Sequence, residues 1–164
     1  MKQFTMSLDK ETQRPITFLQ NWYGLDAMID TGSLFPVWVG DEEILSKMGA
    51  EMLIEHVEFG GFGGNAEGRL YVIPTFQFGE LIYPNFHIIA HKMELPCQMI
   101  LPATMFRKLR YEIDDENHTL NVTVPDNQSN VRNLVIKDSE GKLHVLCTPD
   151  EDVSWYPKDT VCLE

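Results

Sequence analysis

Apolar and polar residues alternate along much of the chain with a period of two, which is the pattern of half-buried β-strands. Phe4, Met6 and Leu8 form the first such run, and a charged turn ending at Pro15 separates it from the next, residues 16–20. Residues 133–137 and 143–147 flank a Gly-bearing turn and are predicted to form a hairpin. Further extended segments are predicted over residues 25–29, 51–59, 68–78, 83–91 and 119–124.

Helical patterns are scarce. Residues 40–48 are predicted to form a short helix with Asp41 as N-cap, because acidic residues follow in its first turn. Residues 102–110 are predicted to form a second, since Pro102 suits a first helical position and apolar residues share one face. Many short strands with few helices favour a sandwich or a barrel. The acidic, proline-containing stretch 148–164 is expected to be a loosely packed tail.

Length and charge narrow the classes of function. The chain has 164 residues, which fits one domain, and a formal net charge of -12. This acidity disfavours binding to nucleic acid or to an anionic membrane surface, both of which attract clustered Lys and Arg. Neither a membrane-spanning run nor a secretory signal is found. Three widely spaced cysteines indicate neither a disulfide framework nor a zinc site, so a cytoplasmic protein is expected.

The first candidate for chemistry is the end of the apolar segment 25–29, where Asp30, Thr31, Gly32 and Ser33 follow. Two carboxylates about 3 Å apart cannot both ionise, so such a pair shares a proton and can activate water. Gly32 would let the backbone approach closely, and Thr31 would bond to a partner loop. Ser33 would hydrogen-bond the Asp30 carboxylate or face solvent. The alternative interpretation is an ordinary turn that ends a strand.

A glycine-rich segment lies between two predicted strands downstream of Asp30. No helix and no Lys-Ser/Thr pair follows it, so it is a poor phosphate-binding loop. It suits a mobile flap that closes over a ligand and excludes water, and a plain glycine-rich turn is the alternative. A third segment, 98–106, is an apolar strand leading into the second predicted helix. The residues of the flap candidate are Gly60, Gly61, Phe62, Gly63 and Gly64.

In this order and spacing, the three segments resemble the retropepsin-like aspartic proteases, the single-domain relatives of pepsin, over residues 4–124. The resemblance implies a mostly β fold, a closed retropepsin-like barrel with one or two short helices. It implies a protease domain over residues 1–125, extended by a C-terminal hairpin and acidic tail over 126–164.

The resemblance also implies roles for residues. Asp30 would be the catalytic carboxylate, and Thr31 would grip the partner chain across the two-fold axis. Gly32 and the flap would hold the backbone of a bound peptide, and Ser33 would support the loop. The candidate pocket residues are Leu34, Phe35, Met99 and Leu101.

The sequence departs from the family pattern at two linked places. Viral members usually carry an acidic residue two positions after the glycine, paired with a Gly-Arg at the start of the late helix. Leu34 and Leu101-Pro102 stand at these positions here, which is consistent with an apolar replacement of the charge pair. Family members commonly dimerise through their terminal strands, so the residues after Val124 imply a rebuilt dimer interface.

The number of aspartate motifs decides the expected assembly. Asp-Thr-Gly or Asp-Ser-Gly occurs once, so one chain cannot supply two equivalent carboxylates. A pepsin-type site would need a homodimer with one Asp30 from each chain at a two-fold axis. The prediction is a homodimeric aspartic endopeptidase that cleaves a peptide or protein without a cofactor. A non-catalytic peptide-binding or regulatory module and a monomeric structural domain are the alternatives.

Other chemistry is weaker. His87 and His91 are four residues apart, but on a strand they would lie roughly 13 Å apart, which disfavours a metal site. The Gly-x-Ser-x-Gly motif of serine hydrolases is absent. Four aromatic residues near Asp30 would line peptide pockets or pack in the core. They are Trp22, Tyr23, Phe35 and Trp38.

Overall fold

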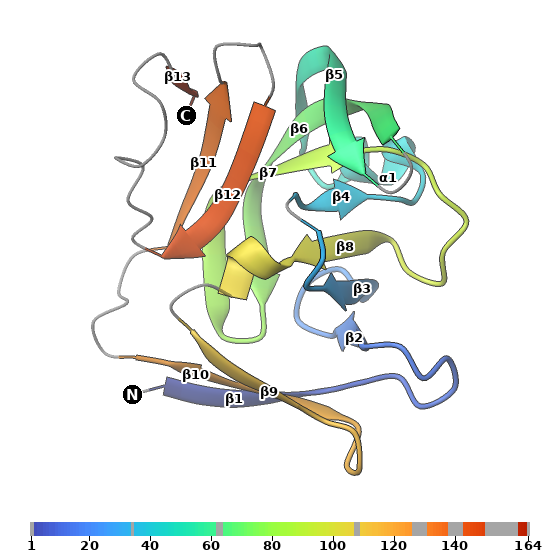
Figure 1. Ribbon diagram of the computed structural model, residues 1–164, viewed down its shortest axis with the longest axis vertical. Coiled ribbons are helices and arrows are strands. Elements are labelled where there is room, and N and C mark those ends of the chain that lie inside the picture. Colours follow the sequence, from blue (N-terminus) through green and yellow to red (C-terminus); the bar gives the residue numbers. More distant parts are fainter. Residues whose placement is uncertain are drawn as a thin grey trace.

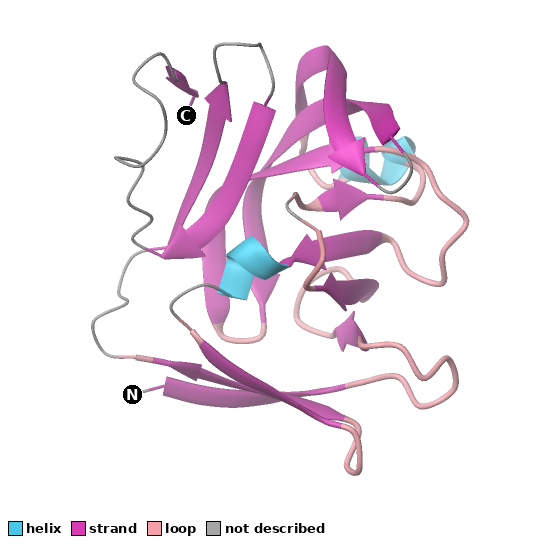
Figure 2. Ribbon diagram, in the orientation of Figure 1, coloured by secondary structure: helices cyan, strands magenta, loops and turns pink. Residues whose placement is uncertain are grey.

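The computed structural model describes residues 2–33, 35–61, 64–106, 109–125, 131–137, 143–149 and 161–163. Side chains are described for residues 2–33, 35–57, 66–102, 105–106 and 109–125. The described chain is mostly β (Figures 1 and 2). Its elements are β1 (Lys2–Ser7), β2 (Ile16–Leu19), β3 (Leu25–Asp30), β4 (Val37–Trp38), α1 (Glu42–Lys47), β5 (Glu51–Gly61), β6 (Gly64–Phe78), β7 (Leu81–Ala90), β8 (Met99–Pro102), the 3₁₀ helix η1 (Ala103–Phe106), β9 (Arg110–Asp114), β10 (Thr119–Val124), β11 (Val131–Lys137), β12 (Leu143–Pro149) and β13 (Val161–Leu163).

The largest sheet has seven strands in the order β2-β3-β8-β4-β7-β6-β5. β8 lies between β3 and β4, parallel to β3 and antiparallel to β4. Since β3 and β4 are successive along the chain, the segment that joins them passes across the end of β8. That segment begins with Thr31, directly after the candidate catalytic aspartate.

Two smaller sheets complete the described fold. One has the order β1-β10-β9 and lies at the lower end of the view in Figure 1, and the other is the hairpin β11–β12 with β13. The expected closed barrel is wrong for the described strands, because β2 and β5 end the large sheet without pairing with each other. The outer edge of β2 is instead met by the chain leaving β1, where Leu8 pairs with Thr17 and the N–H of Asp9 donates to Ile16.

Aromatic side chains from β6, β7 and the β2–β3 turn form the centre of the core. Phe76 is fully buried and lies within 6 Å, ring centroid to ring centroid, of Trp22, Tyr83 and Phe86. The indole N–H of Trp22 donates to the carbonyl oxygen of Thr75 at 2.9 Å, so this buried polar atom is satisfied. The core therefore ties the β2–β3 turn to the last residues of β6 and to β7.

The small sheet containing β1 is attached to this core through aromatic contacts. Phe4 meets Phe78 edge to face at a centroid distance of 6.3 Å. Gly79 has a φ of +58°, and a Cβ there would overlap the Phe4 ring, so the turn after β6 requires glycine for two reasons. The N-terminal strand is thus fixed against the turn between β6 and β7.

The first predicted helix is confirmed as α1, with Asp41 in extended N-cap conformation. Its carboxylate does not cap the helix and instead accepts from Lys92 Nζ at 2.7 Å. Glu42 accepts from Arg69 Nη1 at 2.7 Å and from the Tyr71 hydroxyl at 2.8 Å. Burial and, to a smaller extent, this bond to Glu42 raise the pKa of Tyr71. These contacts hold α1 against β6.

The second predicted helix is much shorter than expected. Among the described residues of this range only η1 is helical, and the chain is extended again at Arg110, where β9 begins. The strands β4 and β13 were not predicted. They have two and three residues, which is too short for a period of two to be recognised. The expected tail includes the end of β12 and all of β13, which pairs with β11, and the rest of it lies outside the described residues.

Candidate active site

Asp30 is the last residue of β3 and lies opposite Pro102, the last residue of β8. Because the two strands are parallel, both end at the same edge of the sheet. Ala27 and Ile29 are buried on one face of β3, and the alternation leaves Asp30 half-exposed. The sequence therefore presents one carboxylate at a strand end while its apolar neighbours anchor the strand.

The loop after β3 is held by its own hydrogen bonds. The N–H of Gly32 donates to Asp30 Oδ1 at 2.9 Å, and the N–H of Ser33 donates to the carbonyl oxygen of Asp30 at 3.0 Å. A Cβ at Gly32 would lie 3.3 Å from Asp30 Oδ1, so glycine leaves this oxygen room. Thr31 and Gly32 are exposed. One carboxylate oxygen is thus oriented by the loop backbone.

The Ser33 hydroxyl neither hydrogen-bonds the Asp30 carboxylate nor points only to solvent, which were the two possibilities from the sequence. Its Oγ donates to the carbonyl oxygen of Phe35 at 2.8 Å, which ties the loop to its own far end. That end is fixed in the sheet, because the N–H of Ile89 donates to the Pro36 carbonyl oxygen at 3.1 Å. Ser33 is therefore a supporting residue of the loop.

Three of the four candidate pocket residues lie in the core of the single chain. Phe35 is 7% exposed, and Met99 and Leu101 are fully buried. Leu34 lies outside the described residues. Met99 and Leu101 belong to β8 and pair with β3 at Ala27 and Ile29. A contribution of these side chains to a substrate pocket stays a prediction.

The glycine-rich segment closes the long hairpin formed by β5 and β6. Gly60 pairs with Asn65 and Gly61 pairs with Gly64, so these glycines continue the two strands. Phe62 and Gly63, the central residues of the predicted flap, lie outside the described residues. The pairing of β5 with β6 shifts register twice between Met52 and Val57, which marks irregular pairing nearer its base.

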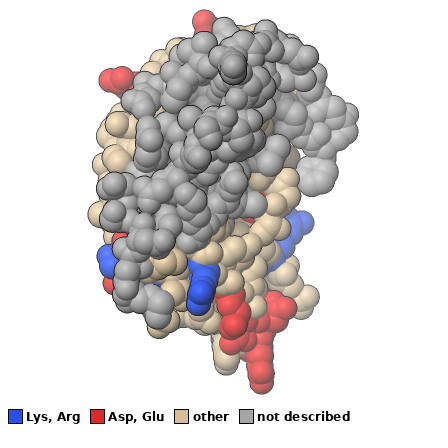
Figure 3. All heavy atoms as spheres, turned by 60° about the vertical axis from the view of Figure 1, so that its left-hand side comes forward, with Lys and Arg blue, Asp and Glu red and all other residues tan. Residues whose placement is uncertain are grey.

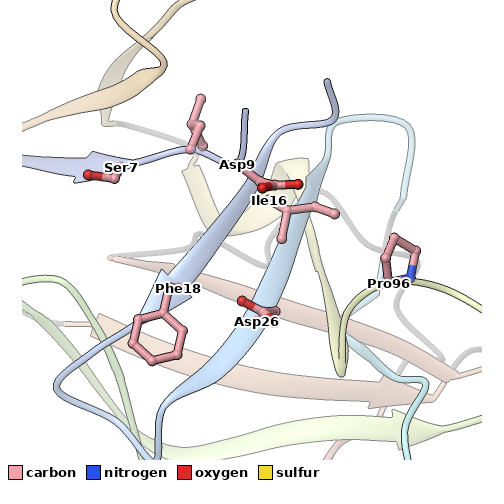
Figure 4. Close-up of a pocket in the computed structure, with 7 residues that line it drawn as sticks. Ser7, Asp9, Ile16, Phe18, Asp26 and Pro96 are labelled. Atoms are coloured by element: carbon pink, nitrogen blue, oxygen red, sulfur yellow. The ribbon is translucent and has the colours of Figure 1, made fainter. Parts of the chain in front are cut away.

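Two hollows lined by described residues lie away from the aspartate loop. The first, of about 250 Å³, is shown in Figure 4 and places the carboxyl of Asp26 beside Phe18 and Ile16. Burial, and then the negative charge of Asp9, raise the pKa of Asp26. The second, of about 590 Å³, shares Asp9 with the first and also includes Arg14. Asp26 was not singled out from the sequence, because nothing in the chain pattern signals that Asp9 lies near it.

The remaining candidates are explained by packing. His87 is buried within β7, and His91 Nδ1 lies 2.8 Å from the carbonyl oxygen of Glu67. Among the described side chains, no group of three His, Cys, Asp or Glu is arranged to hold a metal ion. No helix in the described part of the chain has the length and apolar character to cross a bilayer. Of the aromatic residues near Asp30, Trp22, Phe35 and Trp38 are buried and Tyr23 is exposed.

Comparison with known proteins supports the fold. No family model and no curated protein sequence matches the chain. Among solved structures, a retropepsin-like aspartic protease from Rickettsia conorii superposes with a TM-score of 0.50 at 12% sequence identity. The match covers 75% of this chain and 91% of that protein. At this identity the likeness concerns the fold: the chain is mostly β and folds like a retropepsin-like protease.

Proposed function

We propose that the chain is a homodimeric aspartic endopeptidase whose active site contains one Asp30 from each copy. The observation that carries the proposal is the geometry of the loop after β3. Asp30 ends a strand, and one of its oxygens accepts the N–H of Gly32, on a fold like that of an aspartic protease. A second carboxylate would come from a partner, because the motif occurs once in the sequence.

In the proposed reaction, a water molecule lies between the two carboxylates. The ionised Asp30 takes a proton from the water, and the oxygen of that water attacks the peptide carbonyl carbon. The protonated Asp30 gives its proton to the carbonyl oxygen, and a tetrahedral diol forms. The C–N bond then breaks as a proton moves to the leaving nitrogen, which leaves a carboxylic acid and an amine. The two carboxyl groups would titrate as one coupled pair.

Substrate binding would follow from the same strands. The glycine-rich end of the β5–β6 hairpin would close over an extended peptide and exclude water. The peptide would add as a strand, so that its backbone contributes affinity and side-chain pockets contribute specificity. The net charge of -12 favours the approach of a basic substrate. A cytoplasmic location, reaction without a cofactor and a domain boundary near residue 125 stay predictions.

The test compares two aspartates of the same strand. Asp30→Asn is expected to lower the cleavage of a peptide library by about 1,000-fold or more, because the general base is lost. Asp26→Asn is the matched control, since Asp26 lies four residues earlier on β3 beside a separate hollow, and it should retain wild-type turnover. Equal turnover by wild type and Asp30→Asn would overturn the proposal.

A peptide-binding module on the same fold is the second candidate. The absence of the family's charge pair favours it, because Leu34 and Pro102 stand where the two charged residues would be expected, and Pro102 is buried at the end of β8. Such a module would bind an extended peptide without turnover, and Asp30→Asn would leave the affinity unchanged. Measuring binding and cleavage of the same peptides separates the two functions.

A further inference from the structure

Two hollows adjoin along the outer side of β2, and both are lined by Leu8 and Asp9. The first, of about 250 Å³, lies over β2 and β3 and is drawn in Figure 4. The second, of about 590 Å³, lies between the loop before β2 and the turn that joins β9 to β10. Among the described residues, Asp30 and those of its loop line neither hollow. The two hollows together form the β2 groove, whose lining includes Leu8, Asp9, Ile16, Phe18, Asp26 and Ile113.

The first hollow presents an exposed aromatic ring. Phe18 is 56% exposed although its neighbours along β2 are buried, and it lies opposite Asp26 of β3. The ring rests against Gly24, because a Cβ at that glycine would lie 3.4 Å from it. The buried side chain of Ile16 adds further apolar lining. Apolar surface of this kind in a recess is typical of a binding site.

Two carboxylates line the same hollow. The hydroxyl and the N–H of Thr12 donate to Asp9 Oδ2 at 2.6 and 3.0 Å, and these bonds fix the Asp9 carboxylate and lower its pKa. Asp26 is half-buried, and its carboxylate forms no ion pair or hydrogen bond with a described residue. Burial and the charge of Asp9 raise the pKa of Asp26. No Lys or Arg of the described chain lines this hollow, so its negative charge is not balanced within it.

The second hollow adds apolar surface and mixed charges. Leu8, Pro15 and Ile113 line it, and the side chain of Ile113 is 37% exposed. Arg14 and Asp115 bring opposite charges to its wall. Asp115 belongs to an acidic turn, and Figure 3 shows acidic atoms gathered at the tip of the molecule, where the β9–β10 hairpin ends. The groove therefore combines an acidic recess beside an aromatic ring with a larger recess that is partly apolar.

Charge distinguishes the occupants that this groove suits. A second copy of the chain would bring a net charge of -12, and residues 150–152 of the chain itself are all acidic. Either would add negative charge beside Asp9 and Asp26, which is unfavourable. A basic side chain would instead meet both carboxylates. An arginine fits best, because its planar guanidinium binds carboxylates and also stacks on an aromatic ring such as that of Phe18.

We propose that the β2 groove is a docking site for a segment of a partner protein that carries an arginine next to an apolar residue. The guanidinium would contact Asp26 and Asp9 over the Phe18 ring, and the apolar residue would occupy the second hollow. Docking here and cleavage at Asp30 would be separate events, since Asp30 does not line the groove. The inference does not rest on the proposed peptidase activity, because a non-catalytic protein would present the same groove.

The experiment is an NMR titration of the isotope-labelled full chain with the peptide acetyl-Leu-Arg-Leu-amide. The backbone amide signals of Phe18 and Asp26 should shift as the peptide binds, with a Kd of about 1 mM or lower. The same peptide with citrulline in place of arginine keeps the shape of the side chain and lacks its charge. It should bind about fivefold or more weakly, because the attraction to the carboxylates and to the ring is lost.

Variants of the protein locate the contact. Asp26→Asn and Phe18→Ala should each weaken binding of the arginine peptide about fivefold or more. Asp30→Asn is the matched control for the carboxylate, since it makes the same change at the other aspartate of β3. Ile82→Ala is the control for the ring, because Ile82 is 55% exposed and does not line the groove. Both controls should bind like wild type.

The proposal is overturned if the arginine peptide shifts neither amide signal, if the citrulline peptide binds equally well, or if Asp26→Asn and Phe18→Ala bind like wild type. Shifts of the same signals when the protein alone is concentrated would identify a second copy as the occupant and reject a basic partner. Amide spectra of each variant establish that it is folded. A wild type that cleaves no peptide but binds the arginine peptide at these residues would reject the proposed peptidase while retaining the β2 groove.

Discussion

Asp30 and Pro102 face each other at the ends of two parallel strands that are distant in the sequence. The chain leaves both strands at this edge, as the loop beginning with Thr31 on one side and as η1 on the other. The carboxylate therefore lies where side chains can reach solvent, while Ile29, one residue earlier, is 3% exposed. The backbone that carries the Asp30 side chain is thus fixed by the pairing of two strands.

Gly32→Ala should affect turnover more than stability. A Cβ at this position would lie 3.3 Å from Asp30 Oδ1, so either the carboxylate or the N–H that orients it must move. We expect turnover to fall about tenfold or more, because misplacement of a catalytic group is costly. The free energy of unfolding should change by less than about 1 kcal/mol, since the residue is exposed. Peptide cleavage and urea unfolding measure the two effects.

Gly40→Ala is the control for this substitution. A Cβ there would meet Gln98 and Trp38 at ordinary contact distances of 3.5 and 3.6 Å and would contact neither Asp30 nor its loop. Turnover of this variant should equal that of wild type. An unchanged turnover of Gly32→Ala itself would mean that the bond between Gly32 and Asp30 does not matter for catalysis.

Asp26→Asn should stabilise the protein at neutral pH. Burial and the charge of Asp9 raise the pKa of Asp26 in the folded state above its ordinary value of 3.8, so ionisation disfavours folding. The wild type therefore loses stability as the pH rises through the raised pKa, and the variant does not. Urea unfolding of both proteins across this range should show a gain at neutral pH that disappears near pH 3.8. No gain at neutral pH would contradict this account.

Phe76→Ala should cost about 3–5 kcal/mol of unfolding free energy, because it empties the centre of the aromatic core. Ile82→Ala is the control on the neighbouring strand. Its side chain is 55% exposed, so we expect a change within about 0.5 kcal/mol. Thermal or urea unfolding compares them, and equal costs would mean that the core does not lie around Phe76.

Gly68→Ala should destabilise the pairing of β6 with β7. A Cβ at Gly68 would overlap the carbonyl oxygen of Ala90 and approach Ile89 Cγ2 to 2.7 Å, and backbone cannot yield as a flexible side chain does. We expect a loss of about 1–3 kcal/mol, the usual cost of overpacking. An unfolding midpoint equal to that of wild type would contradict this prediction. It would mean that β6 and β7 can move apart at Gly68 and Ala90 without loss of stability.

Local patterns in the sequence predicted most strands but not how they assemble. The apolar run before Asp30 and the alternation in residues 119–124 correspond to β3 and β10, because period and turn residues act over a few positions. The insertion of β8 between β3 and β4 joins residues about 60 to 70 positions apart, and no local period encodes it. The open ends of the sheets were missed for the same reason.

The local structure around Asp30 was predictable to the same extent, and its catalytic role stays a prediction. A strand that ends in Asp-Thr-Gly identified the position of Asp30, and the loop hydrogen bonds agree with the expected need for Gly32. The bond from Ser33 to Phe35 was not foreseen, since it depends on how the loop returns to the sheet. β9 was not predicted as a strand, and its first residue, Arg110, was assigned to the end of the second predicted helix.

The placement of β8 also sets an order of events when the protein is made. β3 and β4 are separated by the width of a strand that is synthesised much later, so the loop between them cannot take its final shape until residue 102 has left the ribosome. Long-range pairings of this kind form slowly, since the intervening chain must close first. A growing chain would therefore carry Asp30 without the loop geometry of the folded protein until β8 has joined the sheet.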